Sequence, residues 1–463
     1  MAWAGGSVPR LVVVGAGVAG LATARAALDA RPDLDVCVLE REPRVGGLVE
    51  TERTAEGFVV EHGADCLVTS KPAGLETARR VGLEDDVVTG EGAPRATFMA
   101  QQDALVPLPP GLAFGIPVTA RQMLRTPVLS FAAKLRMALE PLVPLSEGDA
   151  DESVAAFVER RFGRGFLDRV IEPLLGGIHG APADVLSLQA CLPRLRELER
   201  AYGSVVLGMR RQARERAMQG AAAPPVVSLR GGMASLPEAL ARSLGPRVRT
   251  GVGVRAAARH GADFRLALDD GGTLDADALV VAAPAHVAAG LVAPLSPALA
   301  TLLGRVRHGR LDCVTFGWGP REVGHPLAGT GFLVPRGEGR PTRACSWSST
   351  KWPGRAPKGS VLIRSVLDAP EADDDALVEA ARRDLRDLMG IEAAPSLVRV
   401  RRRTHGLPIY AVGALERLRE VREEAAELGA FAFAGNAHGG IGVPDCIQSG
   451  REAAAAVLGR IPA

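Results

Sequence analysis

The sequence predicts an α/β protein with a Rossmann-like dinucleotide-binding domain, a mixed α+β second domain and a helical insertion. Three observations predict this class. The chain opens with a strand, a glycine turn, a helix and a second strand over residues 10–40. Patterns of the same kind return at 219–300 and at 405–463. Residues 119–215 show helical periodicity and no strand signal. A discontinuous domain, interrupted by two insertions, accounts for this order.

The first glycine turn has the spacing G-x-G-x-x-G and directly follows an apolar strand pattern. Gly15 allows the tight turn, Gly17 lets the backbone approach a pyrophosphate, and Gly20 lets the helix pack closely on the strand. The alanine-rich helix that begins here offers free N–H groups and the positive end of its dipole, first at Val18 and Ala19. This order predicts a dinucleotide phosphate site.

A carboxylate and a second glycine turn complete this unit. Glu40 lies 20 residues after the last of the three glycines, where its carboxylate can accept hydrogen bonds from a ribose diol and repel a 2′-phosphate. Arg41 follows it, and Arg44, Gly46 and Gly47 then form a second glycine turn beside the first. A nicotinamide dehydrogenase needs only the first turn. The second turn therefore predicts a longer, permanently held dinucleotide, FAD, with these residues among its contacts.

Composition limits the function classes. The chain has 463 residues, of which 47% are hydrophobic, enough for two or three domains with a large core. Its formal net charge of +2 argues against a nucleic-acid partner. The six cysteines show no C-x-x-C pair and no zinc-site spacing, so we expect free thiols and no metal. Neither a secretory signal nor a membrane-spanning apolar run occurs, so we expect a cytoplasmic protein with at most peripheral membrane contact.

The same patterns give the expected domain limits. Residues 95–106 are typical of a hairpin, 311–365 of further strands and 397–403 of a last strand of the second domain. The apolar positions of the helical insertion favour packing over a substrate cavity, with peripheral docking on a bilayer as the alternative. We expect the cofactor domain at 8–94, 219–300 and 405–463, a substrate and helical insertion at 95–218, and the rest of the substrate domain at 301–404.

The C-terminal segment predicts a second contact with the cofactor. An apolar strand leads to Gly435 and Asn436, and a glycine loop then starts a helix. Backbone N–H groups at Gly442 and Val443 would face the pyrimidine edge of the flavin. They would stabilise negative charge there, as a helix N-terminus does for any anion. A helix that only covers the sheet is the alternative.

These ends and several internal segments resemble one group of flavoenzymes. The two glycine turns, E-H-G-A-D at 61–65 and G-G-I-G-V-P at 439–444 are similar to those of the FAD superfamily of amine oxidases, phytoene desaturases and protoporphyrinogen oxidases. LVPLPPGLAFGIP, IEPLLGGIHGAPADVLSL, LRGGMASLPEAL and ACSWSSTKWPGRAP resemble the protoporphyrinogen and coproporphyrinogen III oxidases. FGIP, KWP and GVPDCI most resemble the Gram-positive-type coproporphyrinogen III oxidases.

The resemblance implies an FAD-dependent oxidase of heme biosynthesis that removes six electrons from coproporphyrinogen III and yields coproporphyrin III. Hydride passes from a methylene bridge to flavin N5, and O2 takes up the electrons in three rounds to give three H2O2, without a side-chain acid or base or a metal. Protoporphyrinogen IX is the alternative substrate. An amine oxidase and a non-catalytic flavoprotein scaffold are the alternatives of other classes. A transient contact with a ferrochelatase is also implied.

The resemblance further implies site residues. Arg95 would meet a substrate propionate and Lys71 would lie beside the site; a surface arginine and a helix-start lysine are the alternatives. His179, expected beside the substrate, stands where the family has tyrosine, and Ala414 stands where histidine often follows glycine. Walls of the cavity, each equally explained as plain core, are expected at Ile178, Phe332, Leu333, Trp347 and Trp352. Further cofactor contacts are expected at Gly63, Ala64, Asp65, Val254 and Ala283.

Overall fold

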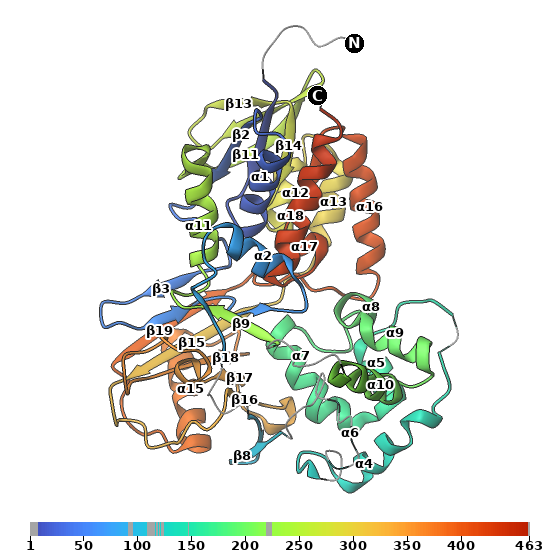
Figure 1. The fold of residues 1–463 in the computed structure, drawn as a ribbon, viewed down its shortest axis with the longest axis vertical. Helices are drawn as coiled ribbons and strands as arrows, with labels where there is room; N and C mark the ends of the chain where they lie inside the picture. The colour runs from blue at the N-terminus through green and yellow to red at the C-terminus, as the bar shows by residue number, and fades with distance from the viewer. Residues whose placement is uncertain are drawn as a thin grey trace.

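The computed structural model describes residues 8–90, 96–108, 116, 119, 121, 125–146, 148–218 and 225–461. The chain forms two halves stacked along the long axis of the molecule (Figure 1). In the upper half, helix α1 at Val18–Ala30 lies beside helix α18 at Val443–Leu458. The lower half holds a mostly antiparallel sheet and the helices of the insertion (Figure 1). Segments from opposite ends of the sequence therefore build one domain.

The upper half is organised around a five-stranded parallel sheet in the order β10-β2-β1-β14-β20. Along β1, Leu11 and Val13 belong to one core, Val12 and Val14 belong to another, and all four are buried. Strands that are apolar on both faces are typical of parallel sheets covered by helices on both sides. The strands are β1 at Arg10–Val14, β2 at Asp35–Glu40, β10 at Val248–Thr250, β14 at Ala278–Val281 and β20 at Phe431–Phe433.

Helices from all three chain segments cover this sheet. On one face α1, α11 and α18 share a core, and α18 approaches α1 so closely that a Cβ on Gly450 would lie 2.3 Å from the carbonyl oxygen of Ala19. On the other face lie α12, α13, α16 and a small antiparallel sheet. The bounds are α11 at Ser235–Leu244, α12 at Ala285–Val292, α13 at Pro297–Gly304, α16 at Ala414–Glu427, β11 at Val254–His260, β12 at Asp263–Leu268 and β13 at Thr273–Ala276.

Short strands and one helix lie between the two halves (Figure 1). One pair is the antiparallel hairpin of β3 and β4. A three-stranded sheet in the order β5-β9-β6 joins the first chain segment to the second. The bounds are β3 at Thr51–Arg53, β4 at Val59–Glu61, β5 at Leu67–Val68, α2 at Ala73–Arg80, β6 at Val87–Val88 and β9 at Val226–Leu229.

The lower half is built on a seven-stranded sheet in the order β19-β15-β18-β17-β16-β7-β8. Its neighbouring strands are antiparallel, except that β16 and β7 are parallel. Helix α15 at Asp374–Met389 packs on one face, and Met99 and Leu333 face the helical insertion on the other. The strands are β7 at Thr97–Gln101, β8 at Ala104–Pro107, β15 at Leu311–Trp318, β16 at Gly331–Leu333, β17 at Thr342–Ser346, β18 at Val361–Leu367 and β19 at Leu397–Arg403.

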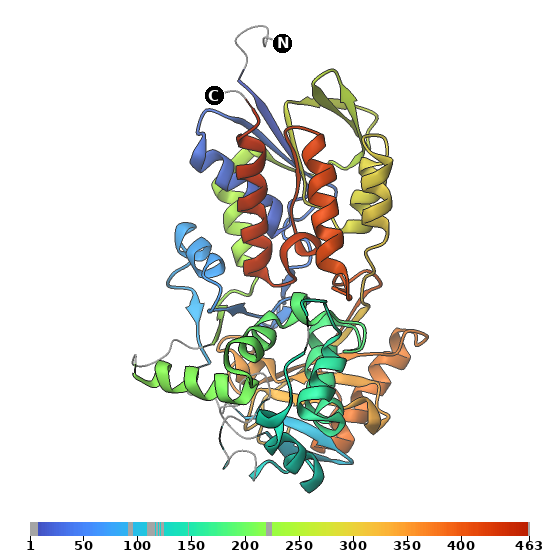
Figure 2. The ribbon, with the colours of Figure 1, turned by 90° about the vertical axis from the view of Figure 1, so that its right-hand side faces the viewer.

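The helical insertion forms a layer beside this sheet (Figure 2). Its helices bury aliphatic and aromatic residues in a core of their own, which includes Phe157, Phe162 and Phe166. A π-helical turn interrupts the path between α6 and α7. The elements are α4 at Phe131–Ala138, η1 at Glu140–Leu142, α5 at Val154–Phe162, α6 at Arg164–Phe166, η2 at Leu167–Ile171, α7 at Glu172–His179, α8 at Leu188–Cys191, α9 at Pro193–Tyr202 and α10 at Val205–Met218.

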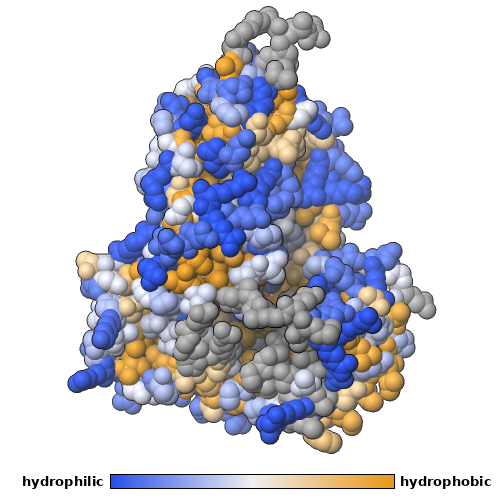
Figure 3. Space-filling model, viewed as in Figure 1, coloured by the Kyte–Doolittle hydropathy of each residue, from blue (hydrophilic) through white to orange (hydrophobic). Residues whose placement is uncertain are grey.

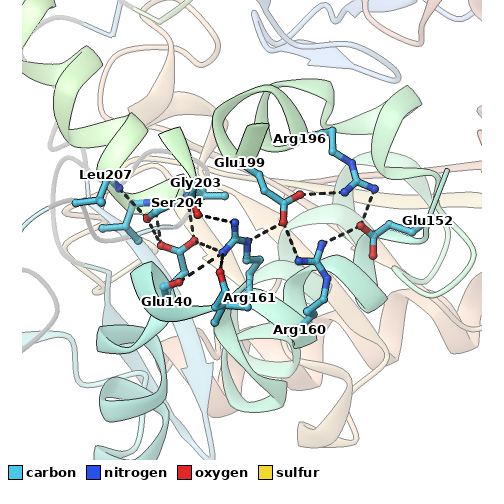
Figure 4. A network of polar contacts seen from close by, with 12 residues as sticks. Glu140, Glu152, Arg160, Arg161, Arg196, Glu199, Gly203, Ser204 and Leu207 are labelled. Carbon is cyan, nitrogen blue, oxygen red and sulfur yellow. Dashed lines mark hydrogen bonds and ion pairs between the residues drawn. The ribbon is translucent and has the colours of Figure 1, made fainter. Parts of the chain in front are cut away.

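A buried charge network fastens the helices of the insertion together (Figure 4). Arg161 has no exposed side-chain surface. It donates to Glu199 Oε1 at 2.9 Å and to the carbonyl oxygens of Val143 and Gly203, both at 2.8 Å. Because each buried charge has a partner, the cost of removing the charges from water is offset. The network sets Arg160, Arg161 and Arg196 against Glu140, Glu152 and Glu199.

This architecture confirms the predicted α/β class, with a cofactor-type sheet drawn from three segments, a mixed second domain and a helical insertion. The predicted hairpin and the last strand of the second domain are also present, as β7–β8 and β19. The sequence patterns did not predict α16, α12 or α13, which cover one face of the upper sheet. The residue limits assigned to the domains stay predictions.

Candidate functional site

The first glycine turn has the backbone geometry of a phosphate loop. Gly15 has φ +104°, and a Cβ there would lie 2.6 Å from the carbonyl oxygen of Ala282. A Cβ on Gly20 would lie 2.0 Å from the carbonyl oxygen of Gly15. Gly17 differs, because its φ is −65° and a Cβ would meet no protein atom within 4 Å. The fold itself requires glycine at Gly15 and Gly20, whereas the space beside Gly17 is open to a ligand.

The second glycine turn lies against the first. Gly46 and Gly17 pair as an isolated parallel bridge, and a Cβ on Gly47 would lie 3.4 Å from the Cα of Gly17. No side chain caps the N-terminus of α1, so the first N–H groups of this helix, at Val18 and Ala19, stay available to an anion. The structure brings both predicted turns to the same edge of the sheet.

Glu40 and Arg44 shape the rest of this edge. The Glu40 carboxylate, at the end of β2, accepts hydrogen bonds from the N–H groups of Ala16 at 2.8 Å and Glu42 at 2.9 Å. A carboxylate has further lone pairs, so it can still accept from a ribose diol. Arg44 donates to the carbonyl oxygen of Gly47 at 3.0 Å. Arg44 therefore holds the second turn in place.

The remaining contacts expected in the upper half lie close to these turns. The guanidinium of Arg41 is 3.5 Å from the carbonyl oxygen of Val254 and 3.2 Å from a carboxylate oxygen of Asp269. Ala283 follows β14, and a Cβ on Gly15 would lie 3.7 Å from its backbone nitrogen. All of these residues follow or flank the carboxyl ends of parallel strands, the edge at which such sheets bind ligands.

The loop with Gly63, Ala64 and Asp65 connects this edge to the lower half. A Cβ on Gly63 would lie 1.9 Å from a backbone oxygen of the segment after the second glycine turn, so glycine is required there. Asp65 forms an ion pair with Lys351, with 2.7 Å between the carboxylate and Nζ. Burial alone would raise the pKa of Asp65, but the charges of Lys351 and Arg364 hold it well below its usual range.

Two arginines of the lower half support the same loop. Arg355 pairs with Glu61 at 3.0 Å, and Arg364 donates to the carbonyl oxygens of Glu61 at 3.0 Å and Gly63 at 2.7 Å. Together with Lys351, three cations from the lower half meet two carboxylates of the segment that connects the halves. We name this group the interdomain charge cluster, and it has one excess positive charge. Its members are Glu61, Asp65, Lys351, Arg355 and Arg364.

The C-terminal glycine loop also reaches the open edge of the upper sheet. Gly435 has φ +121°, and a Cβ there would meet nothing within 4 Å. Asn436 begins the single turn α17 at Asn436–Gly439. Gly442 precedes α18, Val443 is its first residue, and Asp445 accepts from the N–H of Gly442 at 3.2 Å. The C-terminal glycine loop, like the first glycine turn, therefore follows the carboxyl end of a strand of the same parallel sheet.

Lys71 lies at this C-terminal loop. Its Nζ is 2.7 Å from both carboxylate oxygens of Asp445, while half of its side chain stays exposed. The lysine therefore ties the segment before α2 to the start of α18. Its contact with a substrate carboxylate stays a prediction, and Arg95 lies outside the described residues.

The predicted apolar walls divide between two faces of the lower sheet. Leu333 packs against the helical insertion. Phe332 and Trp347 belong instead to the core under α15 and are 1% and 0% exposed; their role as walls of the cavity stays a prediction. Side chains of a strand alternate between its faces, which puts neighbouring residues on opposite sides. Trp352 is also buried, with the Nζ of Lys351 5.3 Å from its ring centre.

His179 ends α7 and is buried. Burial lowers its pKa to about 4, so the imidazole is neutral near pH 7. Its Nδ1 lies 4.0 Å from the sulfur of Cys191. Ile178 belongs to the same helix, but its side chain lies outside the described part of the structure. Ala414, the other departure from the family pattern, is the buried first residue of α16.

The comparisons with known proteins agree with this site. The model of the family described as flavin containing amine oxidoreductase matches residues 18–458. The chain belongs to this family. Its cofactor is FAD, as the two glycine turns predict.

Three relatives show which members of this family the chain resembles. A coproporphyrinogen III oxidase of Bacillus subtilis (strain 168) is 30% identical over 97% of this chain and 97% of that protein. A coproporphyrinogen III oxidase of Propionibacterium freudenreichii is 34% identical over 97% and 90%. The crystal structure of a candidate protoporphyrinogen oxidase from Exiguobacterium sp. 255-15 is 30% identical, covers 98% of this chain and 99% of that chain, and superposes with a TM-score of 0.86. These matches confirm the resemblance to the porphyrinogen oxidases of this flavin family.

The residues present fit FAD. Open space at Gly17 and Gly435 lies where a Cβ would otherwise project, and the N-terminus of α1 has no side-chain cap. Glu40 supplies a carboxylate at the end of the second strand. Within the described ranges no cluster of His, Cys, Asp or Glu could hold a metal ion, and no helix there is long and apolar enough to span a bilayer.

Sequence patterns missed part of this site. Lys351 stands in the K-W-P segment and is one of only four lysines, which is the signal that could have singled it out. Arg355 and Arg364 gave no such signal in an arginine-rich chain. Tyr410, one of two tyrosines, contacts the C-terminal loop. Their partners lie far away along the chain, so only the fold reveals the pairs.

Proposed function

We propose that this chain is an FAD-dependent oxidase that takes six electrons from coproporphyrinogen III, forms coproporphyrin III and passes the electrons to O2 as three H2O2. Relatives named coproporphyrinogen III oxidase, 30% and 34% identical over 97% of the chain, support the substrate. The observation that carries the proposal is the joint itself: the segment from Glu61 to Asp65, which packs against the residue after the second glycine turn, is paired with Lys351, Arg355 and Arg364 of the lower half.

The upper half holds the cofactor and sets its charge environment. Bound FAD supplies a two-electron acceptor for hydride from a methylene bridge of the substrate. The N–H groups of Val18 and Ala19 would hold the pyrophosphate, and Glu40 would hold the ribose. The N-terminus of α18, at Gly442 and Val443, would hold the pyrimidine edge of the flavin and favour negative charge there.

The interdomain charge cluster contributes to the same effect. Its three cations exceed its two carboxylates by one charge. Because most of these side chains are shielded from water, that excess charge acts through a lower effective dielectric than at a surface. The cluster therefore favours a gain of negative charge beside the loop with Gly63 and Asp65. It also keeps the two halves in register, so that a bridge carbon is presented to the cofactor.

The lower half and the helical insertion hold the substrate. Leu333 contributes apolar surface toward the insertion, and His179, neutral near pH 7, adds no charge to it. Four propionates need cations at the rim of such a cavity, and Arg95 and Lys71 are the proposed contacts. When a propionate binds, Lys71 would share its ammonium between Asp445 and the substrate.

The test is a comparison of substrates on the purified protein. We expect a yellow protein whose flavin absorbance is lost within one turnover under anaerobic mixing with coproporphyrinogen III. In air, three molecules of H2O2 should form for each molecule of porphyrin, with the porphyrin measured by its fluorescence. A several-fold faster reaction with protoporphyrinogen IX would establish the alternative, which the Exiguobacterium relative favours. A flavin that stays oxidised with both substrates would make the chain a non-catalytic flavoprotein.

We propose that the protein acts in the cytoplasm. Any membrane contact is peripheral and is made by a row of exposed apolar side chains on the insertion. Phe131 and Leu142 are 80% and 78% exposed, and Leu135, Leu139 and Leu145 lie exposed with them. Figure 3 shows hydrophobic surface at the lower right edge of the molecule, over the insertion. Sedimentation with lipid vesicles, compared for the wild type and Phe131→Ser, tests this contact. The transient contact with a ferrochelatase stays a prediction.

A further inference from the structure

The segment that returns the chain from the lower half to the upper half contacts three parts of the molecule. This segment, residues 405–413, is named the crossover strap. It first runs beside the outgoing connection: Gly309 donates to the carbonyl oxygen of Leu407 at 2.8 Å, and Ile409 donates to that of Arg307 at 2.8 Å. The two connections between the halves therefore form one hydrogen-bonded pair, and the strap continues from it toward α16.

The side chain of Tyr410 joins the strap to the C-terminal loop. Its hydroxyl donates to the carbonyl oxygen of Asn436 at 2.7 Å and accepts from the N–H of Gly440 at 2.9 Å. These two groups stand at the beginning and just after the end of α17. One phenol thus closes the whole turn, and the ring is only 7% exposed. Burial also raises the pKa of this phenol, so it stays a neutral donor at physiological pH.

The backbone of the strap is joined to the helical insertion. Ser187 donates to the carbonyl oxygen of Tyr410 at 2.8 Å. Val412 donates to the carbonyl oxygen of Val185 at 3.2 Å, and Leu186 forms a bridge with Ala411. Tyr410 therefore holds the insertion through its main chain and the C-terminal loop through its side chain.

We propose that Tyr410 is a positioning residue that couples the C-terminal cofactor loop to segment 185–191 of the helical insertion. The coupling rests on the proposed contact between the Gly435–Val443 loop and FAD. When FAD orders the loop, the two hydrogen bonds of the phenol fix the strap, and the strap fixes Ser187 and the start of α8. The insertion that covers the substrate is then correctly placed only in the FAD-loaded protein.

A conservative variant tests this role. Tyr410→Phe keeps the ring and removes both hydrogen bonds of the hydroxyl. We expect FAD to bind about tenfold more weakly. Tyr202→Phe is the matched control, since it changes the other tyrosine of the chain, on α9, and should leave FAD binding unchanged. Equal FAD affinity in wild type and Tyr410→Phe would overturn the proposal.

Hydrogen exchange separates coupling from a general loss of stability. In the wild type, FAD should slow amide exchange in residues 185–191; in Tyr410→Phe with saturating FAD, it should not. Ser449→Ala removes another support of the loop, the acceptor 3.0 Å from the N–H of Gly435. It should weaken FAD binding but retain the effect on 185–191. If FAD leaves exchange of 185–191 unchanged in the wild type, the proposal fails even if Tyr410→Phe does not fold. Failure of the wild type to oxidise any porphyrinogen would refute the proposed function, but the effect of FAD on hydrogen exchange in residues 185–191 would still stand.

Discussion

Replacement of Lys351 by methionine tests whether the interdomain charge cluster is held by its ion pair. In the wild type the Nζ of Lys351 lies 2.7 Å from Asp65, and the two side chains are 22% and 16% exposed. Lys351→Met keeps most of the side-chain volume but leaves the Asp65 carboxylate without its ammonium partner. Breaking such a buried pair costs about 3–5 kcal/mol. We expect about 3 kcal/mol, because the guanidinium of Arg364 still attracts the carboxylate.

The pH dependence distinguishes this cause from a packing defect. The pKa of Asp65 is below its usual range in the folded wild type, so its contribution is present above an unfolded pKa of about 3.9 and is lost as the pH falls through the folded pKa. In Lys351→Met the pKa of Asp65 rises. Protonation then relieves the unpaired charge, so the gap in stability between wild type and variant should narrow as the pH falls through the raised pKa of Asp65 in the variant.

Urea unfolding followed by tryptophan fluorescence measures this gap at several pH values. Lys358→Met is the matched control: Lys358 is exposed, so its loss should change the free energy of unfolding by no more than about 0.5 kcal/mol. Asp65→Asn in the Lys351→Met background should recover part of the loss, because the two side chains interact directly. A gap that is independent of pH, or no larger than that of Lys358→Met, would refute the reasoning.

Three further predictions concern the phosphate loop, the buried network and a histidine. Gly17→Ala should fold normally but lose FAD, whereas Gly20→Ala, whose Cβ would lie 2.0 Å from a backbone oxygen, should unfold more easily; flavin content and thermal unfolding separate the two. Arg161→Gln should cost about 3–5 kcal/mol in urea unfolding, while Arg164→Gln, at an exposed ion pair with Asp168, should cost much less; equal costs would contradict this. Because burial lowers the pKa of His179 to about 4, below the unfolded value of about 6.5, stability should fall as the pH drops from about 6.5 toward 4, and His179→Gln should lose less stability over that range.

The phosphate loop was predictable from the sequence because its requirements are local. The positions of Gly15 and Gly20 follow from backbone sterics within one turn and from contact with a neighbouring strand. The Asp65–Lys351 pair was not predictable, since 286 positions separate the partners and neither residue stands in a motif that names the other.

The apolar walls predicted for the substrate cavity show a different limit of prediction from sequence. A strand of three residues, Gly331–Leu333, carries too few side chains for its alternation to be read, so nothing in the sequence tells which of Phe332 and Leu333 faces the insertion. Helix α16 was missed for another reason. Its sequence, ALERLREVREEAAE, is rich in charge and buries few of its side chains, so its apolar stripe is weak.

The threading of the upper sheet constrains the order of events during synthesis. Strand β14 pairs with β20, and helix α1 packs against α18, which follows β20 in the chain. The helical insertion is contiguous and has its own core, so it can fold while the ribosome is still translating the rest. Capture of FAD, in contrast, has to wait until β20 and α18 have been synthesised. Loss of even the final helix would leave a translated but colourless polypeptide.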